Sequence, residues 1–288
     1  MPPGREPGSA HDLPPGLVAR ARAHHQSLRD GGQPAPVPRD AATVALLRDA
    51  AHGPEVYLLR RVRGMAFAGG MHVFPGGSVD PADAAAGRSL GWAGPSPDDF
   101  ATAFGTSEEL AAALVCAAVR ETFEESGVLL AGASPDEVIA DVSTDEWEAE
   151  RAALEAREQS LSEMLARRRL VLRADLLRPL AHWITPEVEE RRFDTRFFLA
   201  EMPSGQVCRH VGGEADQRLW VRPADALSGG LMMLPPTAAV LGDLARYDAV
   251  AAALDAPRQI SPVLPKLVVG EDDDIAFLLP GDPGYPLP

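Results

Sequence analysis

The sequence predicts an α/β fold, in which short strands alternate with helices. Two runs rich in apolar and β-branched residues, Ala41 to Leu47 and Glu55 to Val62, flank a Gly-Pro turn, a pattern typical of paired strands. The segment from Ser107 to Gly127 has the capping residues and first-turn acids of a helix. A chain of 288 residues, 45% of them hydrophobic, can bury a sizeable core, and we interpret it as one decorated domain.

Composition divides the chain into three regions. Residues 1–38 are rich in Pro and Gly and predict a mobile arm, in which only residues 17–28 could be helical. Residues 39–255 form the predicted domain, and residues 256–288 form a Pro-rich tail. Inside the domain, the segment from Pro81 to Ser107 lacks periodicity and indicates a loop insertion, which we place within residues 84–112.

The second half of the domain predicts four further elements. Asp145 to Leu170 is highly charged, with acids early and arginines late, and indicates one solvated covering helix. Phe193 to Ala200 and Arg218 to Val221 are predicted strands. Thr237 to Leu254 places its apolar residues on one helical face and predicts the last helix.

Charge and hydropathy exclude several classes of function. The net charge of −15 argues against a nucleic-acid partner, because such affinity comes largely from Lys and Arg. The longest apolar run, Leu110 to Val119, is well short of the ~20 residues that span a bilayer, and no signal pattern starts the sequence. With only two cysteines, no disulfide framework is expected. We therefore expect a cytoplasmic protein with no membrane contact.

Three acidic residues stand out on the predicted central helix. Glu121, Glu124 and Glu125 lie at positions i, i+3 and i+4, so their carboxylates share one face. Oxygen ligands of this kind suit Mg²⁺, which keeps several waters and uses a few carboxylates together with substrate phosphate oxygens. The alternative is an ordinary solvated face, and the small repulsion between neighbouring acids does not exclude it.

A longer pattern favours the metal site. Arg120 to Val128 (RETFEESGV) resembles the second half of the Nudix box, and Gly77 with Asp83 resembles its first half. Three features depart from the family. The first acid is Asp83 instead of Glu, and 36 residues separate it from Arg120 where the family has seven. Thr122 also replaces an apolar residue.

The interrupted box is similar to that of the branch containing peroxisomal coenzyme A diphosphatases, and the similarity extends over residues 39–250. It implies a Nudix α/β/α sandwich with a mixed sheet and metal-dependent hydrolysis of a phosphoanhydride bond in a nucleoside-diphosphate-linked substrate. The implied cofactor is Mg²⁺ or Mn²⁺. Glu124 and Glu125 would be the main ligands, Glu121 a further ligand or the base, and Arg120 the orienting residue.

Substrate contacts are predicted outside this helix. Arg192 and Arg196 share one face of a predicted strand and could bind phosphate, although salt bridges to Glu187, Glu189 or Glu190 are the structural alternative. Glu214 follows two glycines and could close over the metal, or could be a solvated loop acid. The glycines of the turn before the insertion complete the predicted substrate-binding set: Gly76 and Gly77.

Three functions remain open at this stage. The first is a diphosphatase acting on coenzyme A or its esters, with ADP-ribose or NADH as the next substrates. The second is a catalytically silent Nudix module that binds a nucleotide, which the split box suggests. The third is a structural interaction protein, which the charged segment at 145–170 suggests. In the first two the partner is a small nucleoside diphosphate derivative, and a homodimer is one option for assembly.

Overall fold

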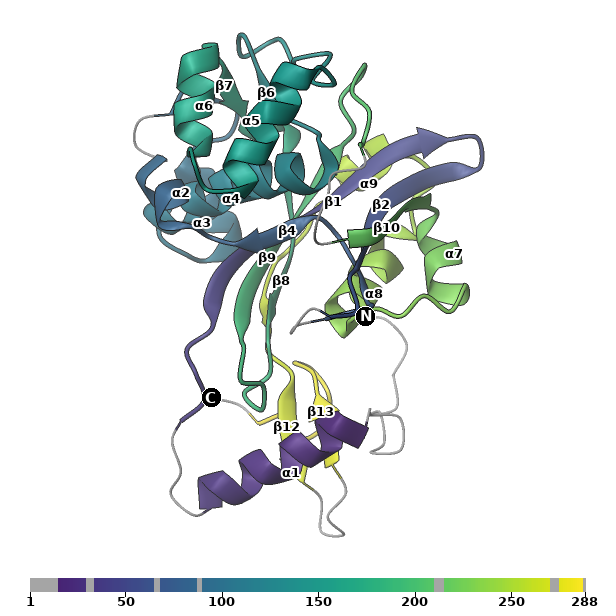
Figure 1. The fold of residues 1–288 in the computed structure, drawn as a ribbon. Coiled ribbons are helices and arrows are strands. Elements are labelled where there is room, and N and C mark those ends of the chain that lie inside the picture. Colours follow the sequence, from purple (N-terminus) through teal and green to yellow (C-terminus); the bar gives the residue numbers. More distant parts are fainter. Residues whose placement is uncertain are drawn as a thin grey trace. The chain divides into compact units, whose positions relative to one another are not determined.

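The computed structural model describes residues 15–29, 34–64, 68–86, 90–209, 215–269 and 275–286 (Figure 1). The chain forms two compact units. The larger unit contains Asp40–His182 and Thr195–Ser261, and the smaller contains Met1–Arg39, Trp183–Asp194 and Pro262–Pro288.

The central sheet begins with the predicted strand pair. Strand β1 (Arg39–Ala50) pairs antiparallel with β2 (Gly53–Arg61), with Leu47 opposite Val56. Gly53 closes the turn with a φ of 106°, a conformation that residues with a Cβ avoid. Strand β1 extends beyond its apolar run at both ends, and β2 begins two residues before its run, because backbone pairing continues where side chains are exposed.

The strand order of the larger unit is β10-β2-β1-β9-β8, with β3 beside β2 and β4 beside β1. The additional strands are β3 (His72–Val73), β4 (Gly76–Ser78), β8 (Arg178–Ile184), β9 (Phe193–Glu201) and β10 (Ala215–Val221). The helices within residues 81–168 lie on one side of this sheet, and α7 (Pro223–Ser228) and α8 (Pro235–Leu244) lie on the other (Figure 1). The predicted α/β class is confirmed.

Helix α4 (Glu108–Ser126) forms the centre of the core. The Ser107 hydroxyl accepts a hydrogen bond from the Leu110 amide, and Gly127 ends the helix in the left-handed conformation. Both caps were predicted. Most of the helix is buried, and its many alanines allow close packing against the sheet. Cys116 is buried there, as expected for a core position.

The prediction of a loop insertion was wrong. The segment contains α2 (Pro81–Ala86), β5 (Trp92–Ala93) and α3 (Pro97–Phe104). Helix α3 is short, so it shows little periodicity, but Ser96 and Asp99 form a capping box that marks its start. Phe104 packs on Phe198 at a ring distance of 5.2 Å. Tertiary contacts therefore stabilise elements whose local signals are weak.

Two predicted long helices are each broken into two. Residues 145–170 contain α5 (Asp145–Glu155) and α6 (Leu161–Arg168), because Arg157 has a φ of 57° and Ser160 starts a new capping box. The last predicted helix consists of α8 and α9 (Val250–Asp255). Periodicity alone does not reveal such breaks when both parts keep the same apolar face.

Among the described residues, no single helix has the length and apolar composition of a membrane span. Helices α3 and α4 pass that test only when taken together, and they are bent by 99° at the break between them.

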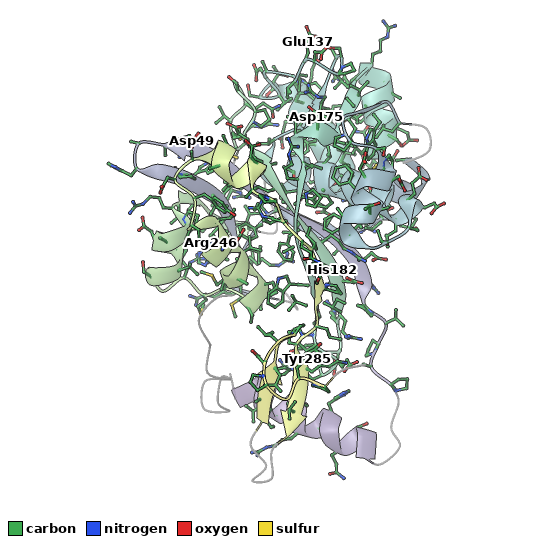
Figure 2. The ribbon with its side chains drawn as sticks, turned by 180° about the vertical axis from the view of Figure 1, so that it is seen from behind. Asp49, Glu137, Asp175, His182, Arg246 and Tyr285 are labelled. Atoms are coloured by element: carbon green, nitrogen blue, oxygen red, sulfur yellow. The ribbon has the colours of Figure 1, made fainter. Side chains whose placement is uncertain are left out.

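The smaller unit contains α1 (Pro15–Arg29), β11 (Pro262–Val263), β12 (Lys266–Val269) and β13 (Ile275–Leu278). The predicted tail thus contains strands, and β12 pairs antiparallel with β13. The Tyr285 hydroxyl, labelled in Figure 2, donates to the carbonyl of Leu264. The predicted helical stretch of the N-terminal arm corresponds to α1. Because this unit combines both ends of the chain with residues 183–194, composition along the sequence does not delimit it.

Removal of the α4 cap should measurably destabilise the protein. We predict that Ser107→Ala lowers the free energy of unfolding by about 1 kcal/mol, since the Leu110 amide loses its acceptor. Thr144→Ala is the matched control, because Thr144 stands at the same position of α5 and its side chain makes no capping hydrogen bond. Urea denaturation of both variants would test this, and equal losses would contradict it.

Candidate active site

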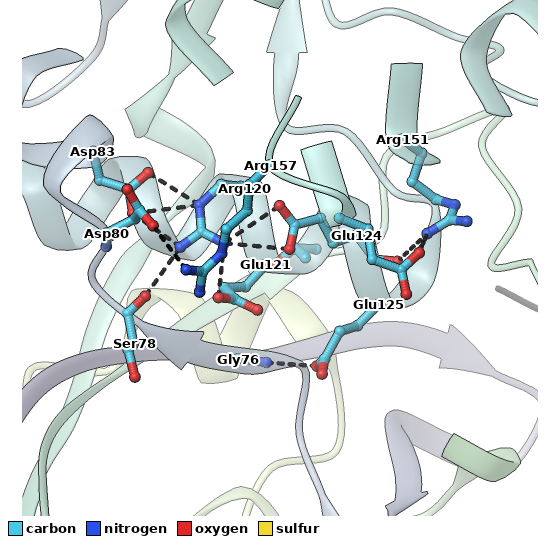
Figure 3. Close-up of polar contacts among 12 residues, drawn as sticks. Gly76, Ser78, Asp80, Asp83, Arg120, Glu121, Glu124, Glu125, Arg151 and Arg157 are labelled. Carbon is cyan, nitrogen blue, oxygen red and sulfur yellow. Dashed lines mark hydrogen bonds and ion pairs between the residues drawn. The ribbon is translucent and has the colours of Figure 1, made fainter. Parts of the chain in front are cut away.

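The three predicted acids of α4 lie beside the glycine strand β4. Glu121 and Glu124 keep 13% and 12% of their side-chain surface exposed, so both are largely removed from water. An oxygen of Glu125 accepts a 2.8 Å hydrogen bond from the Gly76 amide (Figure 3). The face is therefore not an ordinary solvated one.

Arg120 connects these acids to the first half of the motif. One terminal nitrogen of its guanidinium lies 2.8 Å from Glu121 and 3.2 Å from Glu124. The other donates to the Ser78 carbonyl at 3.0 Å and to Asp83 at 2.9 Å (Figure 3). The planar guanidinium has five donors, so it can hold several acceptors in fixed directions. Arg120 thus orients two of the three acids.

Asp83 completes the motif in spite of the long insertion. Its side chain is 2% exposed and forms the ion pair with Arg120. The carboxylate also accepts a 2.9 Å hydrogen bond from the Asp80 amide, which holds it at the start of α2. The inserted elements follow Asp83 and return the chain to α4, so the two halves of the box meet in space.

Gly76 and Gly77 allow the close approach of three elements. A Cβ on Gly76 would lie 2.4 Å from the Thr43 hydroxyl of β1, and a Cβ on Gly77 would lie 2.3 Å from a carboxylate oxygen of Glu121. Neither position has room for a side chain. We predicted these glycines as substrate contacts, and the structure shows that they pack against Thr43 and Glu121.

The site carries excess negative charge. Asp83, Glu121 and Glu124 all contact the single guanidinium of Arg120. Burial, followed by repulsion from Glu121, raises the pKa of Glu124 to about 7, while Arg120 opposes the rise. Carboxylates in excess of their cation form a donor set that suits a hard divalent ion.

The described residues do not present a ready-made metal cage. No group of three or more His, Cys, Asp or Glu side chains within them is arranged to hold an ion. The Arg120 guanidinium lies between Glu121 and Glu124, and Glu125 is bonded to Gly76. Carboxylate oxygens are suitable ligands for a divalent cation. To bind one, these carboxylates would have to turn away from Arg120 and Gly76.

The predicted phosphate-binding arginines make structural contacts. Arg196 is buried and pairs with Asp40 at 2.7 Å. Arg192 belongs to the smaller unit, where it donates to the carbonyls of Pro36 and Thr185. Glu214 lies outside the described residues. The substrate-binding assignments of these residues stay predictions.

A buried arginine that sequence patterns did not single out reaches helix α4. Arg151 of α5 is 5% exposed and donates to the backbone carbonyl of Glu124 at 3.0 Å. The same side chain pairs with Glu148 and Glu155, one turn before and after it. In the sequence this spacing looks like a solvated helix face, so only packing reveals the contact.

Comparison with known proteins identifies the family. The crystal structure of a NUDIX hydrolase from Alicyclobacillus acidocaldarius matches with a TM-score of 0.66 and 31% identity, covering 77% of this chain and 98% of that one. A family model described as the NUDT19 Nudix domain matches residues 97–236. The acyl-coenzyme A diphosphatase NUDT19 of Xenopus laevis is 24% identical over 275 residues, covering 81% of this chain and 71% of that protein.

The chain belongs to the Nudix hydrolase family, and it is an enzyme of that class, which hydrolyses a pyrophosphate linkage. Within the family it is similar to the NUDT19-like coenzyme A diphosphatases. The resemblance inferred from the interrupted box is thus confirmed, while the individual roles of the site residues stay predictions.

The buried pair between the two halves of the box should contribute strongly to stability. We predict that Asp83→Asn lowers the free energy of unfolding by roughly 3 kcal/mol, because Arg120 loses a buried partner. Glu55→Gln is the control, since the exposed pair of Glu55 with Arg48 should contribute less than ~1 kcal/mol. Chemical denaturation measures both, and a loss below 1 kcal/mol for Asp83→Asn would refute the structural role.

Proposed function

We propose that this enzyme hydrolyses the diphosphate linkage of coenzyme A or its acyl esters with the help of a divalent cation. The observation that carries the proposal is the set of partly buried carboxylates on α4, which lie against β4 at Gly76 and Gly77. Their combined negative charge exceeds the single positive charge of Arg120. The substrate follows from the NUDT19 relative, whose name describes an acyl-coenzyme A diphosphatase. Mg²⁺ and Mn²⁺ are both suitable for oxygen donors of this kind.

Each acidic residue has a proposed role. Glu124 and Glu125 are the main ligands, and Glu121 is a further ligand or the base that accepts the proton of the attacking water. A cation bound there would neutralise phosphate charge and lower the pKa of a bound water. Arg120 contacts Glu121 and Glu124 and acts as a positioning residue for both.

The reaction needs only proton transfer and phosphorus substitution. Water attacks one phosphorus of the diphosphate, a carboxylate of α4 takes its proton, and the bond from that phosphorus to the bridging oxygen breaks. The departing phosphate keeps the bridging oxygen. Two phosphate monoesters result, and no oxidant or reductant is required.

Substrate preference can be tested directly. We predict that purified protein with Mg²⁺ or Mn²⁺ cleaves coenzyme A and acyl-coenzyme A with a higher kcat/KM than ADP-ribose or NADH, and that a chelator abolishes turnover. Product identification by mass spectrometry after reaction in ¹⁸O-water would show which phosphorus is attacked. Faster cleavage of ADP-ribose or NADH would retain the hydrolase and reject the proposed substrate.

The assigned carboxylates can be tested one at a time. We predict that Glu124→Gln and Glu125→Gln each lower kcat by at least ~100-fold, because an amide is neutral and binds a hard cation poorly. The fold should persist, since a glutamine at 125 still offers an oxygen to the Gly76 amide.

Glu108→Gln is the matched control for both substitutions, because Glu108 is an exposed acid in the first turn of the same helix. Circular dichroism checks the fold, and steady-state kinetics give kcat. Wild-type turnover in the Glu124 and Glu125 variants would remove the proposed site.

A further inference from the structure

Two residues after the end of helix α5, an arginine has a backbone conformation that is unusual for its type. Arg157 has a φ of 57°, its amide donates to the Leu154 carbonyl, and the Glu158 amide donates to the Ala153 carbonyl, each at 2.8 Å. This pair of hydrogen bonds is the helix ending that glycine usually provides, because a Cβ is strained at positive φ. An arginine at this position points its side chain outward at a cost in backbone strain.

The side chain of Arg157 lies at the edge of the acidic site. It is 84% exposed, and its terminal nitrogen is 3.8 Å from a carboxylate oxygen of Asp80. Asp80 precedes α2, and its amide binds Asp83, the partner of Arg120. Figure 3 shows Arg157 reaching toward Asp80 beside the Arg120 network. An exposed cation thus stands next to the buried carboxylates.

Arg120 and Arg151, which both contact α4, are already paired with carboxylates. Arg120 contacts three carboxylates, and buried Arg151 contacts two. A diphosphate approaching a protein with a net charge of −15 needs accessible positive charge near the site. The pair of Arg157 with Asp80 is long and solvated, so exchanging Asp80 for a phosphate oxygen would cost little.

We propose that Arg157 binds a phosphate oxygen of the substrate's diphosphate. The inference rests on the proposed function and adds to it a substrate contact from the α5–α6 connection. Guanidinium groups suit this task because they offer paired donors to phosphate oxygens. On this basis Arg157 affects substrate binding more than the chemical step.

A matched control is available on the next helix. Arg169 ends α6 with a φ of 55°, and its amide and that of Leu170 form the same pair of hydrogen bonds, to Ala166 and Leu165. Among the described residues it makes no ion pair with the acidic site. Replacing either arginine by glycine relieves the same backbone strain, so neither variant should unfold.

The experiment compares Arg157→Gly, Arg169→Gly and wild type in steady-state hydrolysis of coenzyme A with Mg²⁺. We expect Arg157→Gly to raise KM by about tenfold to a hundredfold, the effect of losing one charged hydrogen bond, with kcat changed by less than about threefold. Arg169→Gly should keep the wild-type KM. Thermal melting should show both variants at least as stable as wild type.

One further readout, the salt dependence of KM, helps to separate the outcomes. Rising salt should raise the KM of wild type more steeply than that of Arg157→Gly, because screening weakens a charged contact. Equal KM values for the two glycine variants would overturn the role of Arg157 while leaving the hydrolase intact. Absence of metal-dependent hydrolysis in wild type would overturn the proposed function and this inference together.

Discussion

The arrangement of the site depends on the guanidinium of Arg120. It is largely buried, and burying an unpaired charge is costly, so it needs carboxylate partners, which Asp83, Glu121 and Glu124 supply. These contacts fix α2, β4 and α4 relative to one another, since the same side chain also binds the Ser78 carbonyl. One cation among several carboxylates fixes their directions without neutralising them. The remaining negative charge is what makes a divalent ion the natural further partner.

The residues around Arg120 allow α4 and its carboxylates to lie close to β4. Gly76 and Gly77 remove the side chains that would separate β4 from β1 and α4. At the end of α4, Arg151 donates to the Glu124 carbonyl, which places a positive charge where helical carbonyls lack partners. Helix α5 is therefore more than a solvated cover, because it holds the turn that carries two of the proposed ligands. The two glycines and the Arg151 contact therefore both support the acidic surface of α4.

Much of the fold and part of the site followed from local patterns. The β1–β2 pair and helix α4 were predictable because alternation, a turn and two caps act over neighbouring residues. The insertion was mistaken for a loop because α3 is short and gains its stability from Phe198, which is distant in the sequence. Likewise, the pairing of Arg196 with Asp40 joins residues far apart in the sequence, so local patterns did not predict it. Contacts between residues far apart in the sequence do not produce a periodic pattern along it.

The sequence by itself determined that Glu121, Glu124 and Glu125 share a helix face, because helical spacing is a property of the backbone. It also carried the split motif that placed the chain among the Nudix hydrolases. Only the tertiary structure decided that Asp83 still meets Arg120 across the insertion, since an ion pair depends on distance in space and not along the chain. It also decided that Arg157 stands exposed beside Asp80, because the break between α5 and α6 sets that direction.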